Sequence, residues 1–155
     1  MPSKQSAGIL AYRIKAGKVL FMLVHPGGPF WKNKDQGSWS IPKGEFTDGE
    51  SAFDAAKREF EEETGLKPEG NFMSLDPIKM KSGKVVYAWA VEGNFDTDAI
   101  KSNTFEIEWP PKSGLLKSFP EVDRAAWFTK EEAIQKINSA QSGFILQLAL
   151  ILEKS

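Results

Sequence analysis

Three glutamates in the first half of the chain have a spacing suited to holding a cation. Glu59, Glu62 and Glu63 stand at positions i, i+3 and i+4, so a helix would place their carboxylates on one face within one turn. Like charges so placed repel, at a cost of roughly 0.2–0.5 kcal/mol for an i,i+4 pair. A hard divalent ion such as Mg²⁺ or Mn²⁺, which prefers oxygen ligands, would turn that repulsion into attraction. Because an acidic run can also be an ordinary solvated helix face, the surrounding residues must decide.

The glutamates belong to a longer pattern that runs from Gly44 to Leu66, GEFTDGESAFDAAKREFEEETGL. Its nine fixed positions are Gly44, Glu50, Arg58, Glu59, Phe60, Glu62, Glu63, Gly65 and Leu66. Since even a common residue such as Gly makes up only about 7% of average composition, a chance match at all of them is on the order of 10⁻⁹ per starting point. The acidic run is therefore part of a specific motif.

This motif resembles the Nudix box at every position, so the chain resembles a Nudix hydrolase. Such enzymes hydrolyse a nucleoside diphosphate linked to another group, with water attacking phosphorus while divalent metal ions hold the polyphosphate. The cations are needed because a polyphosphate repels a hydroxide nucleophile until its charge is neutralised. The resemblance implies that Glu59, Glu62 and Glu63 are metal ligands, together with the main-chain carbonyl of Gly44. The implied cofactor is Mg²⁺ or Mn²⁺.

The resemblance also implies roles for polar residues around these ligands. Arg58 would orient Glu59 through a charge-assisted hydrogen bond. Glu50 would help to hold the metal ligands in position without contacting the metal itself. Glu121 stands six residues before Trp127, a spacing at which several Nudix enzymes carry a glutamate that is a metal ligand or a base. An ordinary loop glutamate is the alternative interpretation of Glu121. The expected catalytic set is Arg58, Glu59, Glu62, Glu63 and Glu121.

The same stretch predicts a single helix. Asp48 or the turn at Gly49 would open it with Glu50 in its first turn, where a negative charge faces the positive end of the helix dipole. Gly65 would close the helix as a left-handed C-cap. The expected core-facing stripe is Phe53, Ala56 and Phe60.

Residues on either side of the box give cues to the substrate. Trp39 to Gly44, read as W-x-x-P-K-G, resembles the dinucleoside polyphosphate hydrolase branch of the family. Lys43 would place a cation beside the metal site, where it could offset phosphate charge. Lys112 could act in the same way further along a phosphate chain. Trp31 and Trp109 lie on or near loops and could stack on nucleobases, although aromatics in loops also serve to pack the loop onto the body.

Composition argues against several other classes of function. The chain has 155 residues, of which 41% are hydrophobic and 26% charged, which favours one globular domain spanning residues 1–155. A net charge of −1 supplies no basic field for nucleic acid or anionic membrane, so neither is an expected partner. The absence of cysteine excludes disulfides, thiolate zinc sites and thiol nucleophiles. Without a signal peptide or an apolar run of about 18 residues, we expect a cytoplasmic monomer or homodimer whose partner is a small-molecule nucleotide.

Hydrophobic periodicity predicts the remaining elements. The predicted strands are Ser6 to Ile14, Lys18 to His25, Asn71 to Met80, Gly83 to Glu92, Phe105 to Trp109 and Arg124 to Phe128. The predicted helices are Lys130 to Ile137, with Thr129 and Glu132 as a capping box, and a last one from Ser139 or Ser142 through Leu152. The segment 115–120 is expected to be a loop, and His25, the only histidine, is assigned no role. The order of elements predicts an α/β sandwich with a mixed β-sheet, and the resemblance implies the Nudix-type α/β/α sandwich.

These residues fit other functions within the family less well. A non-catalytic, ligand-sensing Nudix domain would be expected to lack box carboxylates, and none is missing here. The isopentenyl diphosphate isomerase branch needs a cysteine, and an RNA 5′-end pyrophosphohydrolase would be expected to have a basic surface. The ADP-ribose branch usually has a proline where this chain has Ser82. The function predicted from the sequence is hydrolysis of a phosphoanhydride bond in a nucleotide polyphosphate, with dinucleoside polyphosphates ahead of nucleoside triphosphates, oxidised ones included. The alternatives that stay open are an RNA 5′-end pyrophosphohydrolase and a non-catalytic, ligand-sensing Nudix domain.

Overall fold

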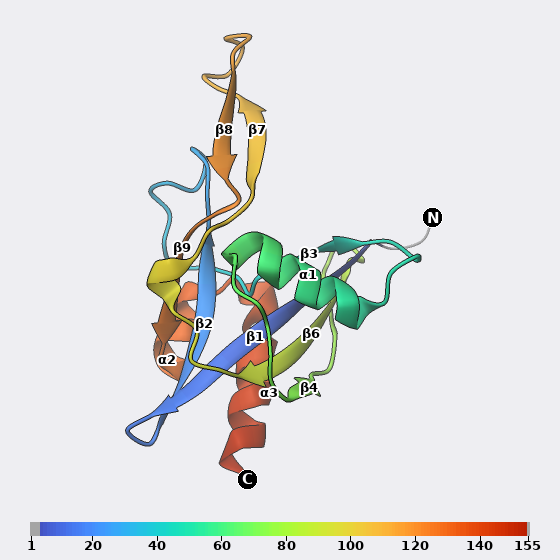
Figure 1. The fold of residues 1–155 in the computed structure, drawn as a ribbon, viewed down its shortest axis with the longest axis vertical. Coiled ribbons are helices and arrows are strands. Elements are labelled where there is room, and N and C mark those ends of the chain that lie inside the picture. Colours follow the sequence, from blue (N-terminus) through green and yellow to red (C-terminus); the bar gives the residue numbers. More distant parts are fainter. Residues whose placement is uncertain (1–3, 155) are drawn as a thin grey trace.

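A mixed β-sheet with helices on both faces forms the body of the computed structural model, which describes residues 4–154 (Figure 1). Its main strands run in the order β4-β6-β1-β2-β9. They are β1 (Gln5–Lys15), β2 (Lys18–Pro26), β4 (Phe72–Ser74), β6 (Val85–Glu92) and β9 (Val122–Phe128). Two short strands, β3 (Lys43–Phe46) and β5 (Ile78–Lys79), pair with β1 and β6. Because β1 and β6 are parallel and the other pairs antiparallel, the predicted mixed sheet is confirmed.

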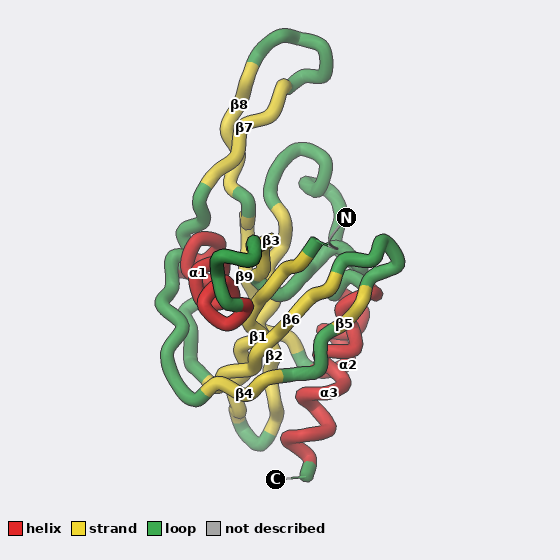
Figure 2. The backbone as a smooth tube through the Cα atoms, turned by 90° about the vertical axis from the view of Figure 1, so that its right-hand side faces the viewer, coloured by secondary structure: helices red, strands yellow, loops and turns green. Residues whose placement is uncertain are grey.

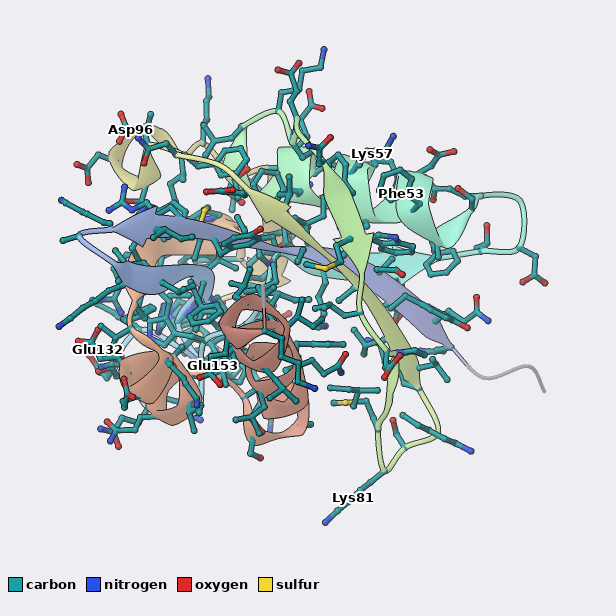
Figure 3. All side chains as sticks on the ribbon, turned by 90° about the horizontal axis from the view of Figure 1, so that it is seen from below. Phe53, Lys57, Lys81, Asp96, Glu132 and Glu153 are labelled. Carbon is teal, nitrogen blue, oxygen red and sulfur yellow. The ribbon has the colours of Figure 1, made fainter. Side chains whose placement is uncertain are left out.

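The sheet is covered by α1 (Ala52–Thr64) on one face and by α2 (Lys130–Lys136) and α3 (Ser142–Glu153) on the other (Figure 3). Alternating residues of the central strands supply the two core layers. Ile9 of β1 packs with Ala56 and Phe60 of α1, whereas its neighbour Leu10 belongs to the layer that contains Phe144 of α3. The prediction of an α/β sandwich is therefore confirmed. Among the described residues, no helix is both long and apolar enough to cross a membrane.

The boundaries of α1 correct part of the sequence prediction. Its N-cap is Ser51, whose hydroxyl accepts a hydrogen bond from the Asp54 N–H at 3.1 Å. Glu50 therefore precedes the helix and does not lie in its first turn. At the other end Gly65 has a φ of 71° and donates its N–H to the Glu61 carbonyl at 2.7 Å, as expected for a left-handed C-cap. Of the expected core stripe, Ala56 and Phe60 are fully buried, but Phe53 is only half-buried.

Two further segments differ from the prediction. The expected long strand from Asn71 to Met80 is divided into β4 and β5, and the Leu75 N–H between them donates to Ala88 of β6 at 2.9 Å. The expected loop at 115–120 is instead mostly strand β8 (Leu116–Pro120), which pairs with β7 (Thr104–Glu108). Those residues show no alternation of apolar and polar side chains, so only the cross-strand pairing reveals the strand. The β7–β8 hairpin is a separate two-stranded sheet that projects from the body (Figures 1 and 2).

The two C-terminal helices follow the prediction. Thr129 accepts from the Glu132 N–H while the Glu132 carboxylate accepts from the Thr129 N–H, so the capping box of α2 is confirmed. A short 3₁₀ turn, Ser139–Gln141, precedes α3, which begins at Ser142. Another 3₁₀ turn, Thr97–Ala99, lies in the loop between β6 and β7.

Candidate active site

Arg58 organises the acidic face of α1. Its guanidinium donates from Nε and Nη2 to the two carboxylate oxygens of Glu50, at 2.8 and 2.9 Å, in the bidentate geometry that arginine favours. The remaining Nη1 donates to Glu59 at 2.9 Å and to Glu62 at 3.2 Å. The hydrogen bond to Glu50 is the main cause of a raised Arg58 pKa, and the same bond lowers the pKa of Glu50. Glu50 thus anchors Arg58 from outside the helix, and Arg58 in turn contacts two glutamates of the box.

Glu59 is the buried member of the acidic cluster, and β3 lies directly against it. Only 8% of Glu59 is exposed. A Cβ atom built at Gly44 would collide with the Glu59 carboxylate, so the strand can pass this close only because Gly44 has no side chain. The interior face of α1 therefore carries a carboxylate whose position depends on a glycine in a neighbouring strand.

Four carboxylates meet at this end of α1. Burial raises the pKa of Glu63 to about 8, and the negative charges of Glu59 and Glu121 add to the rise, while Lys43 opposes it through its charge and its N–H. Burial is also the main cause of a raised pKa at Glu59 and at Glu121, and Glu62 raises both further. The structure thus brings together all four glutamates that were predicted to act in one site.

Asn103 links Glu121 to α1. The Asn103 N–H donates to the Glu62 carbonyl at 2.8 Å, and the Glu121 N–H donates to the Asn103 carbonyl at 2.9 Å. In the side-chain orientation that satisfies its hydrogen bonds, the amide nitrogen of Asn103 donates to the Glu62 carbonyl at 3.3 Å and to Glu121 Oε2 at 3.2 Å. Asn103 was not among the predicted site residues. A single asparagine in a polar loop belongs to no sequence pattern, so its bonds to Glu62 and Glu121 could not be predicted.

A pocket of about 240 Å³ opens beside the carboxylates. Glu63 and Glu121 line it together with Lys43, Trp31 and Gln141. Burial, and then the charge of Lys84, lowers the pKa of Lys43. Trp31 keeps 39% of its surface exposed, and Lys34 Nζ lies 5.2 Å from the centre of its ring. The pocket therefore offers carboxylates, a cation and an aromatic ring to one ligand, and it contains two of the predicted substrate-binding residues, Lys43 and Trp31.

His25 connects two walls of the site. Its imidazole is fully buried, with Nδ1 2.8 Å from Asp123 Oδ1 and Nε2 2.6 Å from the Lys34 carbonyl oxygen. Asp123 follows Glu121 by two residues, and Lys34 belongs to the loop that carries Trp31. His25 therefore fastens the Trp31 loop to the start of β9, a structural task that a lone histidine in a sequence does not indicate.

The other two predicted substrate-binding residues lie elsewhere. Trp109, directly after β7, does not line the pocket, and its ring meets that of Phe30 edge to face with 5.7 Å between centroids. Lys112 is exposed in the turn that joins β7 to β8 and adopts a positive φ of 61°. That turn is the tip of the projecting hairpin in Figure 1, away from α1. The structure thus separates Trp109 and Lys112 from the four carboxylates.

The donor set suits a hard divalent cation, which prefers carboxylate and carbonyl oxygens. Glu59, Glu62, Glu63 and Glu121 could hold such an ion together with the Gly44 carbonyl. Within residues 4–154, no three acidic or histidine side chains are already arranged as a metal-binding group. Arg58 contacts only Oε1 of Glu59 but both carboxylate oxygens of Glu62. Glu59 could therefore offer Oε2 to an ion while Arg58 keeps its hydrogen bonds to Glu59 and Glu50.

The raised pKa of Glu63 predicts a pH-dependent stability for the metal-free protein. Because the folded-state pKa of about 8 lies above the ordinary value of 4.5, folding favours the protonated carboxyl. Its contribution is fully present below the ordinary pKa and is lost as pH rises through the folded pKa. With EDTA present, we expect the Tm of the wild type to fall more between about pH 5.5 and pH 8.5 than the Tm of Glu63→Gln, which cannot ionise.

Glu61→Gln, on the exposed side of α1, is the control for this prediction and should follow the wild type. Parallel Tm curves for the wild type and Glu63→Gln would contradict this.

Comparisons with known proteins agree with the fold and the motif. The chain matches the NUDIX domain family over residues 2–148. A comparison with curated proteins gave no match. Among solved structures, a C. elegans Ap4A hydrolase in a binary complex is similar, with a TM-score of 0.68, 23% identity and coverage of 98% of this chain and 99% of that one.

Two bacterial structures are similar as well. The NUDIX domain of Shewanella oneidensis NrtR, complexed with ADP ribose, has a TM-score of 0.67 at 15% identity and covers 98% of this chain and 90% of that one. A mutT/nudix family protein from Listeria innocua has a TM-score of 0.65 at 18% identity, with coverage of 99% and 97%. Identities this low show a shared fold alone, whereas the family match spans nearly the whole chain. The chain therefore belongs to the NUDIX domain family.

Proposed function

We propose that this Nudix hydrolase is a metal-dependent enzyme that cleaves a phosphoanhydride bond of a dinucleoside polyphosphate. The observation that carries the proposal is the meeting of Glu59, Glu62, Glu63 and Glu121 beside a pocket that also presents Lys43. Clustered carboxylates repel one another, and burial raises the pKa of Glu59, Glu63 and Glu121, so the cluster is suited to receive a cation. A lysine across the pocket is suited to a polyphosphate, whose charge exceeds what one divalent ion neutralises.

Each residue of the site has a chemical task in this proposal. A bound divalent cation would lower the pKa of a water molecule and neutralise phosphate charge. Arg58 keeps Glu59 oriented through its 2.9 Å hydrogen bond. Glu63 and Glu121 are the two carboxylates that line the pocket, so they are the groups placed to accept a proton from the attacking water. Asn103 keeps Glu121 facing α1.

The substrate assignment has two supports. Trp31 offers a half-exposed ring in the wall of the pocket, and stacking of a base on such a ring contributes roughly 1–3 kcal/mol. The structural likeness to an Ap4A hydrolase, named for a dinucleoside polyphosphate, agrees with the W-x-x-P-K-G segment at Trp39 to Gly44. A small-molecule nucleotide is then the only partner that the activity requires.

A hydrolysis screen across nucleotide classes tests the proposal. With Mg²⁺ present, we expect dinucleoside tetra- to hexaphosphates to be cleaved with a higher kcat/KM than nucleoside triphosphates, because each added phosphate adds negative charge near Lys43. Lys43→Ala should narrow that difference, mainly through the longer substrates, and EDTA should abolish all turnover. Lys67→Ala, a highly exposed lysine beyond α1, is the matched control and should behave as the wild type. A tenfold preference for triphosphates or for ADP-ribose would overturn the substrate assignment but not the family chemistry.

A further inference from the structure

A second cavity, of about 520 Å³, lies between the β7–β8 hairpin and the loop that follows β2. We term it the hairpin groove. Its walls include Gly28, Pro29 and Lys32 of the loop and Trp109, Lys117 and Phe119 of the hairpin. Figures 1 and 2 both show this loop beside the hairpin, where the hairpin leaves the body. The volume is within the usual range of small-molecule sites, about 300–1,000 Å³.

The register of the hairpin explains why this wall is aromatic. Phe105 pairs with Phe119 and Ile107 with Lys117, and because strand residues alternate between faces, Trp109 lies on the same face as these four. The opposite face carries Glu106 and Glu108. The hairpin thus turns its aromatic and basic side chains toward the loop and its acidic side chains away from it.

The base of the hairpin is packed tightly on the loop, and the groove opens beyond that contact. A Cβ at Gly28 would come within 2.9 Å of the Phe105 ring, so the glycine allows the loop and the hairpin to meet there. Further out, Phe30 touches Trp109 only edge to face, at an interplanar angle of 77°. Trp109 and Phe119 are both half-buried, so each keeps exposed ring surface at the groove.

The hairpin groove and the carboxylate pocket share their walls. Pro120 and Asp123 line the groove, whereas Glu121 and Val122, between them in the chain, line the pocket. Likewise Lys32 lines the groove and its neighbour Trp31 the pocket. The two cavities are therefore lined by neighbouring residues of the same two segments, which is the arrangement that one elongated ligand would need.

The charge of the groove suits an anionic linker. Lys32 and Lys117 are cations on its opposite walls. The one carboxylate among the lining residues, Asp123, is contacted by His25 Nδ1 at 2.8 Å and by Arg124 Nε at 3.8 Å, which offsets its charge. An aromatic surface flanked by lysines is the combination that binds a base attached to phosphate.

We propose that the hairpin groove is a second nucleoside subsite, which holds the distal base of a dinucleoside polyphosphate against Trp109 and Phe119 while Lys32 and Lys117 contact the phosphate chain. This inference rests on the proposed function, in which the carboxylate pocket receives the reacting phosphates. A mononucleotide has one base and leaves the hairpin groove empty, so the subsite confers selectivity for substrates with two nucleosides.

The test compares two substrates with equal numbers of phosphates, diadenosine tetraphosphate and adenosine 5′-tetraphosphate. We expect the wild type to prefer the first in kcat/KM. In Trp109→Ala the ratio of the two kcat/KM values should fall about tenfold, the size expected for the loss of one stacking contact. In Lys117→Ala it should fall severalfold, with a smaller effect at high salt because the contact is electrostatic. Leu116→Ala changes an exposed side chain on the other face of the hairpin and should keep the wild-type ratio.

The outcomes separate failure of the subsite from failure of the proposed function. If neither tetraphosphate is hydrolysed with Mg²⁺, the proposed function is wrong and the subsite proposal is overturned with it. If both are hydrolysed but Trp109→Ala and Lys117→Ala keep the wild-type ratio, the groove does not bind the second nucleoside, although the proposed function stands. If the wild type preferred a 5′-triphosphorylated RNA oligonucleotide to diadenosine tetraphosphate, and Trp109→Ala lost that preference, the proposal would be overturned and RNA would be the substrate. Should Trp109→Ala unfold, Lys117→Ala decides, because Lys117 is exposed on its strand.

Discussion

Replacing Glu63 by glutamine is expected to lower turnover by two or more orders of magnitude at saturating Mg²⁺. The substitution keeps the volume of the side chain but removes its charge and its capacity to accept a proton. Loss of a general base or of a charge that stabilises the transition state typically costs about 10²–10⁴-fold. Glu62→Gln should have an effect of similar size, because Glu62 belongs to the same cluster. The measurement is kcat for the best substrate of the nucleotide screen.

The fold should survive these changes. Glu63→Gln leaves no charge to be buried or to repel Glu59 and Glu121, so the Tm without metal should equal or exceed that of the wild type. Glu61→Gln provides the control, since Glu61 is an exposed glutamate of the same helix that contributes nothing to the pocket lining. Near-native turnover in either Glu62→Gln or Glu63→Gln would show that the box carboxylates are not the catalytic cluster.

Gly44→Ala should also reduce turnover strongly, by about 10²-fold, while it affects stability much less. The new methyl group would occupy the position of the Glu59 carboxylate and displace it. A misplacement of about 1 Å in a catalytic group can cost 10²-fold in rate. The displaced atoms are the end of a flexible side chain, so the protein can relax at a cost of about 1–3 kcal/mol. Comparing kcat with Tm separates the two effects.

The matched control for that substitution is Gly49→Ala. Gly49 lies in the turn before α1, and a Cβ built there has no heavy atom within 4 Å. Its variant should keep the kcat of the wild type. If Gly44→Ala kept its turnover as well, the contact between β3 and Glu59 would have no part in the reaction.

The sequence by itself determined the features that depend on local periodicity. The i, i+3, i+4 spacing places Glu59, Glu62 and Glu63 around one turn of α1, since helix geometry depends only on the order of residues. Gly65 and the Thr129–Glu132 capping box end or begin their helices through contacts a few residues apart. The order of the predicted strands and helices was sufficient to predict the α/β sandwich.

Only the tertiary structure decided which distant segments meet. Glu121 reaches α1 because Asn103 bonds to both, and the Trp31 loop is held by the contact of His25 with Asp123, 98 residues away. Strand β8 exists through its pairing with β7, and that hairpin carries Trp109 into a groove of its own. These arrangements depend on bonds between residues far apart in the chain, whose partners leave no periodic trace in the sequence. The box could therefore be found by its spacing, and the resemblance pointed to Glu121 and Lys43, whereas the contacts that bring them together in one pocket could not be predicted.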